Sequence, residues 1–253
     1  MKQLQDQVAL VTGSSRGIGA GIARAFAREG AKVAVHGRDR EALARVCAEI
    51  EKDGGTAISV VGDVTKAADL ESMRTQIESE LGPVMLLVAN AGGNPVPPMA
   101  LEEMSEDVWR QTVDMNLTAT FLTLKTFLPG MKKRGAGTII AISSAAARRA
   151  SERSPIAYSA AKAAVELLVQ DTAAQVGRFG IRANIIAPEA ILTERNQRDI
   201  PDDMKVTMAK AHPIARLGTV EDVADAALFL ASSKSGWITG ITIDVAGGAV
   251  MPR

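Results

Sequence analysis

A tyrosine and a lysine four residues apart carry the most reactive chemistry in the sequence. Tyr158 and Lys162 lie in the alanine-rich run SPIAYSAAKAA, where Ser154 is a suitable N-cap and Pro155 suits the first turn of a helix. A helix from there to about residue 178 would place both side chains on one face. A nearby ammonium stabilises a phenolate, so Tyr158 could act as a general acid or base near neutral pH.

An exposed tyrosine–lysine pair without a catalytic role has the same spacing, and the pair alone does not separate the two interpretations. Tyr158 is the only tyrosine in the chain, so no second phenol could replace it. The fold around the pair therefore decides what it can do.

The elements that would position this pair alternate between strand and helix along the chain. Apolar runs predict strands at residues 8–12, 32–36, 57–61, 84–89, 138–142, 182–187 and 241–245. Amphipathic patterns predict helices at residues 16–29, 39–53, 65–81, 105–134, 154–178 and 219–230. Expected helix caps are Asp39, Thr65, Ser105, and Thr219 with Asp222 as a capping box. This alternation predicts a single α/β domain over residues 1–253, with a seven-stranded parallel sheet covered by helices on both faces.

The composition indicates a neutral protein with one sizeable core. The chain has 253 residues, of which 47% are hydrophobic, and its 29 basic and 29 acidic residues balance. Such a balance argues against a nucleic-acid or membrane partner. Cys47 is the single cysteine, and His36 and His212 are too far apart in the sequence for a zinc cluster, so we expect no metal. No run has the length of a signal or membrane-spanning segment, which predicts a reducing, cytoplasmic location.

A glycine-rich turn follows the first predicted strand. It reads Gly13-Ser14-Ser15-Arg16-Gly17-Ile18-Gly19 and leads directly into a helix. Glycines there allow a tight turn and let a pyrophosphate approach the backbone N–H groups at the helix start. Any sharp connection between a strand and a helix can contain glycines, but the position after the first strand favours nucleotide binding.

The end of the second predicted strand bears on which dinucleotide would bind. A fold specific for NAD has a carboxylate there for the ribose hydroxyls, whereas this chain reads His36-Gly37-Arg38. Arg38, together with Arg16, could bind a 2′-phosphate, although a solvated Arg38 is the alternative. We expect NADP(H) to be preferred and NAD(H) to be possible, with His36 as a strand-end residue and not a catalyst.

Across nearly its whole length the chain resembles the short-chain dehydrogenase/reductase family. Residues 12–19 resemble its cofactor motif, Asp63-Val64 the pair beside the adenine, and Asn90-Ala91-Gly92 the motif after the fourth strand. Its catalytic tetrad matches Asn116, Ser144, Tyr158 and Lys162. The resemblance implies a Rossmann fold and hydride transfer between a nicotinamide and a carbonyl or alcohol carbon.

The resemblance also implies a role for each site residue. Ser144 would hold the substrate oxygen, Tyr158 would give or take the proton, Lys162 would lower the pKa of the tyrosine and bind ribose, and Asn116 would support a water relay behind Lys162. Ser143 competes with Ser144 for its role. The implied cofactor residues are Gly13, Ser15, Arg16, Gly17, Ile18, Gly19, Arg38, Asp63, Val64, Asn90, Ala91, Gly92, Tyr158, Lys162, Pro188, Ile191 and Thr193.

Two of these residues have a plainer alternative. Asn116 could face solvent, and Asn90 could bind backbone groups in place of a ligand.

Some positions depart from the family pattern. Ser144 and Tyr158 are fourteen residues apart where thirteen is commoner, and the longer loop holds Arg148, Arg149 and Arg153, which are either solvated or able to attract an anionic substrate. Glu189 follows Pro188 where the family usually has glycine. It either points to water or faces the substrate near the nicotinamide. Ala246 also replaces a common aspartate.

Residues 191–212 resemble the substrate lid of the family, and their Met204 and Met208 suit an apolar substrate. The family resemblance also implies a homotetramer or a homodimer. We predict an NADPH-dependent reductase of a small carbonyl substrate, free or carrier-linked, similar to 3-oxoacyl-carrier-protein reductases. The alternatives are an NAD(P)-dependent alcohol dehydrogenase that works in the oxidative direction and a non-catalytic regulatory protein that binds the cofactor.

Overall fold

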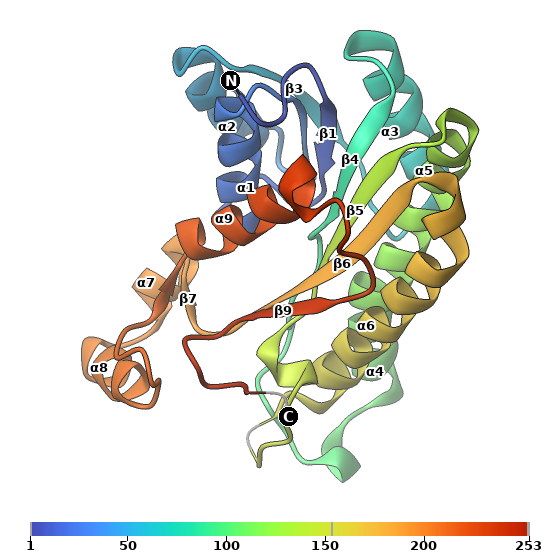
Figure 1. Ribbon diagram of the computed structural model, residues 1–253. Helices are drawn as coiled ribbons and strands as arrows, with labels where there is room; N and C mark the ends of the chain where they lie inside the picture. The colour runs from blue at the N-terminus through green and yellow to red at the C-terminus, as the bar shows by residue number, and fades with distance from the viewer. Residues whose placement is uncertain (1, 153, 252–253) are drawn as a thin grey trace.

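Seven parallel strands form the central sheet, in the order β3-β2-β1-β4-β5-β6-β9 (Figure 1). The computed structural model describes residues 2–152 and 154–251. The strands are β1 (Val8–Val11), β2 (Lys32–Gly37), β3 (Thr56–Val61), β4 (Val84–Ala89), β5 (Gly137–Ile142), β6 (Ile181–Pro188) and β9 (Thr242–Val245). The predicted parallel α/β sheet is confirmed.

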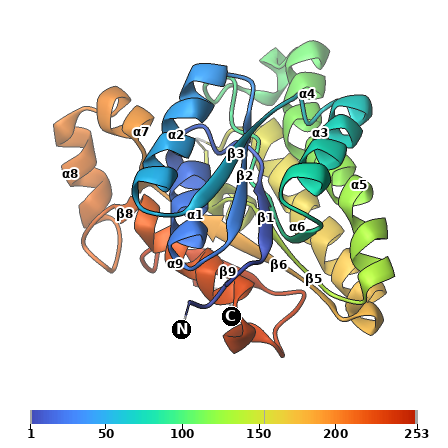
Figure 2. The same cartoon turned by 90° about the horizontal axis from the view of Figure 1, so that it is seen from above.

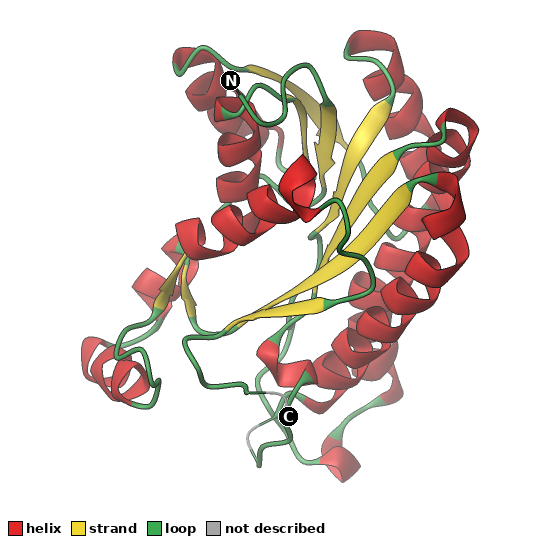
Figure 3. Ribbon diagram, viewed as in Figure 1, coloured by secondary structure: helices red, strands yellow, loops and turns green. Residues whose placement is uncertain are grey.

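Helices cover both faces of this sheet (Figures 2 and 3). On one face lie α1 (Gly17–Arg28), α2 (Arg40–Lys52) and α9 (Val220–Ala231). On the other lie α3 (Ala67–Glu80), α5 (Ala119–Arg134) and α6 (Ile156–Val176), with α4 (Glu106–Val113) against α6. Successive residues of β1 point to opposite faces, Ala9 into the first core and Leu10 into the second. Burial on both faces explains why the strands are continuous apolar runs.

The predicted helix over residues 105–134 is continuous but not regular. Between α4 and α5 the backbone makes a π-turn, η2 (Asp114–Thr118), and Asn116 lies in it. Single π-helical turns of this kind are frequent at functional sites. Short 3-10 turns occur at η1 (Leu101–Glu103), η3 (Ala145–Ala147), η4 (Gly177–Phe179) and η5 (Ser233–Ser235).

Most of the predicted caps are confirmed, and two are wrong. Asp39, Ser105 and the Thr219–Asp222 capping box have the expected bonds. The hydroxyl of Thr65 donates instead to Asp63 Oδ1 at 2.7 Å, and α3 begins after Lys66 without a side-chain cap. Ser154 also makes no cap: its hydroxyl lies 3.2 Å from that of Ser159. In the first case a nearby carboxylate acceptor competes with the cap.

The predicted lid segment belongs to a small outlying unit whose strands and helices were not predicted. Strands β7 (Ile191–Leu192) and β8 (Gly218–Thr219) pair in parallel, and helices α7 (Glu194–Asp199) and α8 (Asp202–Lys210) lie between them in sequence. Figure 1 shows this unit projecting beside the sheet, beyond the end of α9. Throughout the described part of the chain, no helix combines the length and the apolar character needed to cross a bilayer.

Candidate functional site

A cavity of about 370 Å³ opens where the carboxyl ends of β1, β4, β5 and β6 meet. Strand β1 pairs with β2 on one side and β4 on the other, so the chain changes direction here, which is where open α/β sheets bind ligands. The predicted residues that line it are Gly13, Arg16, Ile18, Gly19, Asn90, Gly92, Ser144, Tyr158, Lys162, Pro188, Ile191 and Thr193.

Other predicted residues are not part of the lining of this cavity, and a few unpredicted ones are. The first group is Ser15, Gly17, Arg38, Asp63, Val64, Ala91 and Asn116, and the second is Gly93, Ile142, Ala190 and Asn196. Ser143, the predicted competitor of Ser144, also lines the cavity. The second group consists mainly of sequence neighbours of predicted residues.

The floor of the cavity needs glycine at two positions. A Cβ atom on Gly13, whose φ is +65°, would lie 2.9 Å from the backbone of Ala91. One on Gly19 would lie 2.5 Å from the carbonyl oxygen of Gly13. Both distances are shorter than real Cβ contacts, so a side chain at either position would force the turn apart. The turn keeps backbone N–H groups accessible to a ligand at the start of α1.

One carboxylate already lies at the start of α1. Glu194 of α7 accepts a hydrogen bond from the backbone N–H of Gly17 at 3.1 Å. The carboxylate stands where an anionic group suits the helix N-terminus, so the turn fits the pyrophosphate of a dinucleotide. Sequence reasoning missed Glu194 because 177 positions separate it from Gly17.

His36 and Asn90 form hydrogen bonds with the backbone at the start of the glycine turn. Nδ1 of His36 accepts from the Gly13 N–H at 3.1 Å, so Nε2 carries the proton donated to Gly62 O at 3.1 Å. Burial lowers the pKa of His36, which agrees with this neutral form. The Asn90 amide donates to the carbonyl oxygens of Thr12 at 2.8 Å and Gly13 at 3.0 Å. Asn90 therefore binds backbone, and its side chain also borders the cavity.

The exposed edge beyond β2 carries the predicted adenosine residues. Arg38 is exposed, and the guanidinium of Arg16 lies 3.3 Å from Asp39 Oδ2. Hydrogen bonds from Thr65 hold the pKa of Asp63 below its usual range, and the positive charges of Lys66 and Arg38 act in the same direction. Arg16, Arg38 and Lys66 thus bring positive charge to this edge beside the carboxylates of Asp39 and Asp63.

Ser144 and Tyr158 meet across the cavity. Both residues line the cavity, and the backbone N–H of Ala146 donates to Ser144 Oγ at 3.2 Å. Burial raises the pKa of Tyr158, and the bond with Ser144 only partly offsets it. The expectation that Lys162 depresses this pKa is therefore not met by the protein alone, because burial destabilises the phenolate more than the protein groups stabilise it.

Lys162 is 3% exposed and lies next to the ring of Tyr158. Its Nζ atom is 5.7 Å from the centre of the Tyr158 ring and donates to the carbonyl oxygen of Ile142 at 2.8 Å. Burial lowers the pKa of Lys162 to about 8. A buried lysine of this kind can exchange a proton at moderately alkaline pH.

Asn116 is completely buried, so the solvent-facing alternative is wrong. Its amide nitrogen donates to the carbonyl oxygens of Gly93 and Thr112, both at 2.9 Å, and its Oδ1 atom accepts from the Gly93 N–H at 3.0 Å. A Cβ atom on Gly92 would lie 2.6 Å from Asn116 Oδ1 and 3.4 Å from Lys162 Nζ. Asn116 thus fixes the loop that borders Lys162.

The two described arginines after Ser144 are both paired with carboxylates, Arg148 in a mostly buried position and Arg149 in an exposed one. Arg148 bonds to Glu166 and Asp244, and Arg149 bonds to Glu189 and to the carbonyl oxygen of Ala249. The solvated alternative is therefore wrong for Arg148, whereas Arg149 is exposed, as that alternative predicts, and is also ion-paired. Arg153 lies outside the described residues.

Glu189 takes neither of its two predicted orientations. Its carboxylate pairs with Arg149 and lies 3.0 Å from Nε2 of His212, a buried residue after α8. The flanking Pro188 and Ala190 line the cavity, and the side chain of Glu189 turns away from it. Ala190, with φ of 47°, has the left-handed backbone at this corner, which explains why Glu189 tolerates the loss of glycine.

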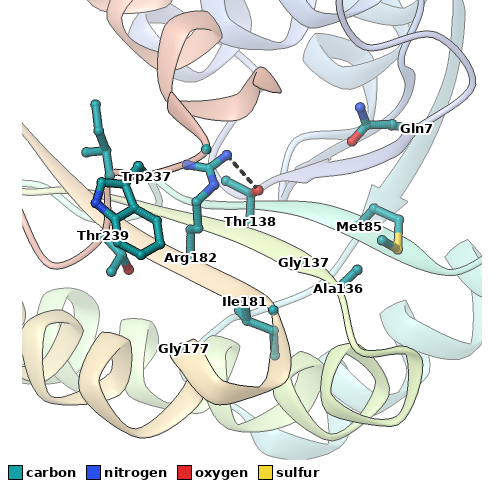
Figure 4. A pocket seen from close by; sticks show the side chains of 13 residues that line it. Gln7, Met85, Ala136, Gly137, Thr138, Gly177, Ile181, Arg182, Trp237 and Thr239 are labelled. Carbon is teal, nitrogen blue, oxygen red and sulfur yellow. Dashed lines mark hydrogen bonds between the residues drawn. The ribbon is translucent and has the colours of Figure 1, made fainter. Parts of the chain in front are cut away.

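A larger cavity, of about 610 Å³, lies at the opposite edge of the sheet, at the amino ends of β5 and β6 (Figure 4). Arg182 donates there to Thr138 Oγ1 at 3.2 Å, and burial lowers its pKa. Arg182 is the sole ionisable side chain among the described residues that line this cavity. No acid–base pair exists there, so the smaller cavity is the better candidate site. No three His, Cys, Asp or Glu side chains of the described residues are placed to hold a metal ion.

The fold and this cavity define a dinucleotide-dependent oxidoreductase of the short-chain type. A family model described as Enoyl-(Acyl carrier protein) reductase matches residues 13–250. The chain belongs to the short-chain dehydrogenase/reductase family and is an NAD(P)-dependent oxidoreductase.

Named relatives cover nearly the whole chain. A 7alpha-hydroxysteroid dehydrogenase of Escherichia coli (strain K12) is 36% identical over 248 residues, which are 98% of this chain and 96% of the relative. The 3-oxoacyl-[acyl-carrier-protein] reductase FabG of Chlamydia muridarum is 35% identical over 246 residues, covering 97% and 98%. The solved 7 alpha-hydroxysteroid dehydrogenase complexed with NADH and 7-oxo glycochenodeoxycholic acid is 36% identical, with a TM-score of 0.92 over 99% of this chain and 96% of that one.

Proposed function

We propose that this chain reduces a ketone or another carbonyl to an alcohol with NADPH. The observation that carries the proposal is the meeting of Ser144, Tyr158 and Lys162 in one cavity at the carboxyl edge of the sheet. In this proposal Asn116, Ser144, Tyr158 and Lys162 form the catalytic group. Residues 191–212 act as a substrate lid of a single domain that spans residues 1–253.

The glycine turn is suited to hold the cofactor. Backbone N–H groups at the start of α1 would bind its pyrophosphate, Arg38 and Arg16 its 2′-phosphate, and Asp63 and Val64 its adenine. Lys162 would hold the ribose, with Pro188, Ile191 and Thr193 beside the nicotinamide. The bound cofactor supplies a hydride.

The chain's own residues handle the substrate oxygen and its proton. The hydroxyl of Ser144 donates a hydrogen bond to that oxygen, and the phenol of Tyr158 transfers its proton to it as the alcohol forms. Lys162 and the loop held by Asn116 then lie on the side from which the phenol regains its proton. The reverse transfer serves oxidation.

Arg38 supports the preference for NADPH, whereas the solved relative with NADH shows that NAD is used within the family. We expect Arg38→Ala to lower kcat/KM for NADPH by about 10- to 150-fold, because a hydrogen bond to a charged group contributes about 1.5–3 kcal/mol. The value for NADH should change little. Steady-state kinetics with both cofactors measure this. Arg40→Ala, at an exposed neighbouring position, is the control. Equal kcat/KM for NADPH and NADH in the parent protein would refute the preference.

Two relatives point to different directions of reaction, since one is named a dehydrogenase and the other a reductase. A panel of ketones, carrier-linked 3-oxoacyl groups, hydroxysteroids and sugar alcohols with both cofactors in both redox states tests the proposal. Faster carbonyl reduction with NADPH supports it. Turnover confined to alcohols would favour the oxidative alternative, and cofactor binding with no turnover on any class would favour a regulatory protein.

We propose a homotetramer as the assembly. Phe121 of α5 and Leu167 of α6 are exposed on helices that cover one face of the sheet. Phe229 is exposed on α9, which covers the other face, and Trp237 is exposed after η5. Two separate apolar faces are what two kinds of two-fold contact in a tetramer need. Sedimentation equilibrium should give about four times the chain mass of 26.5 kDa. Leu167→Arg should reduce it to a dimer. A parent monomer would exclude the proposal, and a parent dimer would leave one of the two faces unused.

A further inference from the structure

A buried polar network lies directly behind Ser144. Its members come from four elements: Ser143 follows β5, Arg148 follows η3, Glu166 belongs to α6 and Asp244 belongs to β9. The side chains of Glu166 and Asp244 are each 9% exposed. Buried carboxylates need partners, and here they share a single arginine.

A continuous chain of hydrogen bonds joins Ser143, directly after β5, to Asp244 of β9. Ser143 Oγ donates to Glu166 Oε1 at 2.8 Å, and Arg148 Nη1 donates to Glu166 Oε2 at 3.0 Å. Arg148 Nε and Nη2 donate to the two carboxylate oxygens of Asp244, at 3.1 Å and 3.4 Å. Arg148 therefore binds one acid with one nitrogen and the other acid with two, a geometry that fixes the plane of its guanidinium group.

Glu166 connects this network to the catalytic helix. It follows Lys162 by one turn and Tyr158 by two, so the three side chains lie along one face of α6. Ser143 precedes Ser144 in the sequence and Arg148 follows it. Both residues donate a hydrogen bond to the carboxylate of Glu166. The segment that carries Ser144 is thus fastened to the helix that carries Tyr158.

The chain itself does not fix the distance between these two hydroxyls. Fourteen positions separate Ser144 from Tyr158, through a loop in which the covalent connection is long. The bond that the Ser144 hydroxyl accepts from the backbone N–H of Ala146, at 3.2 Å, comes from the same segment and does not restrain this segment relative to α6. A rigid support on the far side of Ser144 therefore sets where its hydroxyl stands.

We infer that Arg148 and Glu166 are positioning residues that hold the Ser144 hydroxyl in register with Tyr158. The inference rests on the proposed function, since it assumes that Ser144 orients a substrate oxygen. Neither side chain is expected to touch substrate. Asp244 acts as the outer anchor, because its β9 position pairs with Ala187 of β6 and so joins the network to the sheet.

The test compares Arg148→Met in two backgrounds. In the parent, kcat should fall by about 10- to 100-fold, since small misplacements of reacting groups have costs of this order. The dissociation constant of NADPH, measured by fluorescence, should stay within about twofold because the network lies away from the glycine turn. In a Ser144→Ala background, Arg148→Met should lower the residual kcat less than about threefold, because the group that it positions is already gone.

Arg74→Met is the matched control. Arg74 also bonds to two glutamates, Glu71 and Glu78, both at 2.9 Å, but it belongs to α3, which contributes no residue to the lining of the cavity. Its loss should leave kcat unchanged in both backgrounds. If Arg148→Met does not fold, Arg148→Lys keeps the charge but not the two-nitrogen contact with Asp244, and it should give a smaller loss of kcat that again disappears without Ser144.

An equal loss in both backgrounds would overturn the inference, because the network would then act on general structure and not through Ser144. An unchanged kcat in a folded Arg148→Met protein would overturn it as well. Failure of the proposed function looks different: the parent would show no turnover, or Ser144→Ala alone would leave turnover intact.

Discussion

Tyr158→Phe should abolish most turnover while the protein stays folded and still binds its cofactor. The substitution removes one hydroxyl, which is the proton donor in the proposed reduction, and general acid–base catalysis contributes about 10²–10⁴-fold. We expect kcat and kcat/KM to fall together within that range, because the lost contact acts in the transition state. The measurement is steady-state reduction of the best carbonyl substrate from the panel.

The pH dependence gives an independent test of the same role. Burial raises the pKa of Tyr158, and only the protonated phenol can donate. The reductive rate of the parent should therefore fall as pH rises through this pKa, and the residual rate of Tyr158→Phe should lack that decline. NADPH affinity, followed by fluorescence, is the control for site integrity. Turnover within about threefold of the parent would be below the expected range and would contradict a proton-donor role.

Most of the fold could be predicted from the sequence because its strands are buried on both faces and hence appear as continuous apolar runs. The strands of the outlying unit could not be predicted, because β7 and β8 have two residues each and so few residues show no alternation of apolar and polar side chains. Thr65 shows a second limit: it is a good cap residue, but Asp63 captures its hydroxyl. Competition between local acceptors is not visible in residue types alone.

The candidate site could likewise be predicted only in part. Ser144, Tyr158 and Lys162 come from motifs with fixed spacing, and the structure brings them to one cavity. The groups that support them come from distant positions: Arg148 and Asp244 are 96 positions apart. An arginine in a loop and an acid in a strand each suggest a solvated side chain. Only their joint burial shows that they are partners.

Lys162 should be essential for turnover and yet destabilise the protein without its cofactor. We expect Lys162→Met to lower kcat/KM by at least about 10²-fold, because the group beside the proton donor is lost. NADPH affinity should fall about 10- to 150-fold if the ammonium binds ribose. The same variant should raise the melting temperature of the cofactor-free protein at pH 7, a gain that no catalytic argument predicts.

The sign of the stability change follows from burial. The pKa of Lys162 falls from 10.5 to about 8, so between these values the folded protein binds fewer protons than the unfolded chain. The contribution of Lys162 to the free energy of unfolding of the parent protein therefore becomes more favourable as pH rises from 8 to 10.5. Below pH 8 the buried ammonium destabilises the parent by its full cost of about 3 kcal/mol. Methionine removes that cost but leaves the Ile142 carbonyl without its donor, which costs about 1–3 kcal/mol and leaves a net gain of at most about 2 kcal/mol.

Thermal unfolding of parent and variant at several pH values measures this prediction. For a chain of this length 1 kcal/mol shifts the melting temperature by about 2–4 °C, so the variant should melt up to about 8 °C higher at pH 7. The difference should shrink as pH rises from 8 to 10.5. Lys133→Met, at an exposed position of α5, should show no such trend. A difference that stays constant with pH would mean that the charge of Lys162 is not what burial penalises, and its proposed exchange of protons with the site would lose its physical basis.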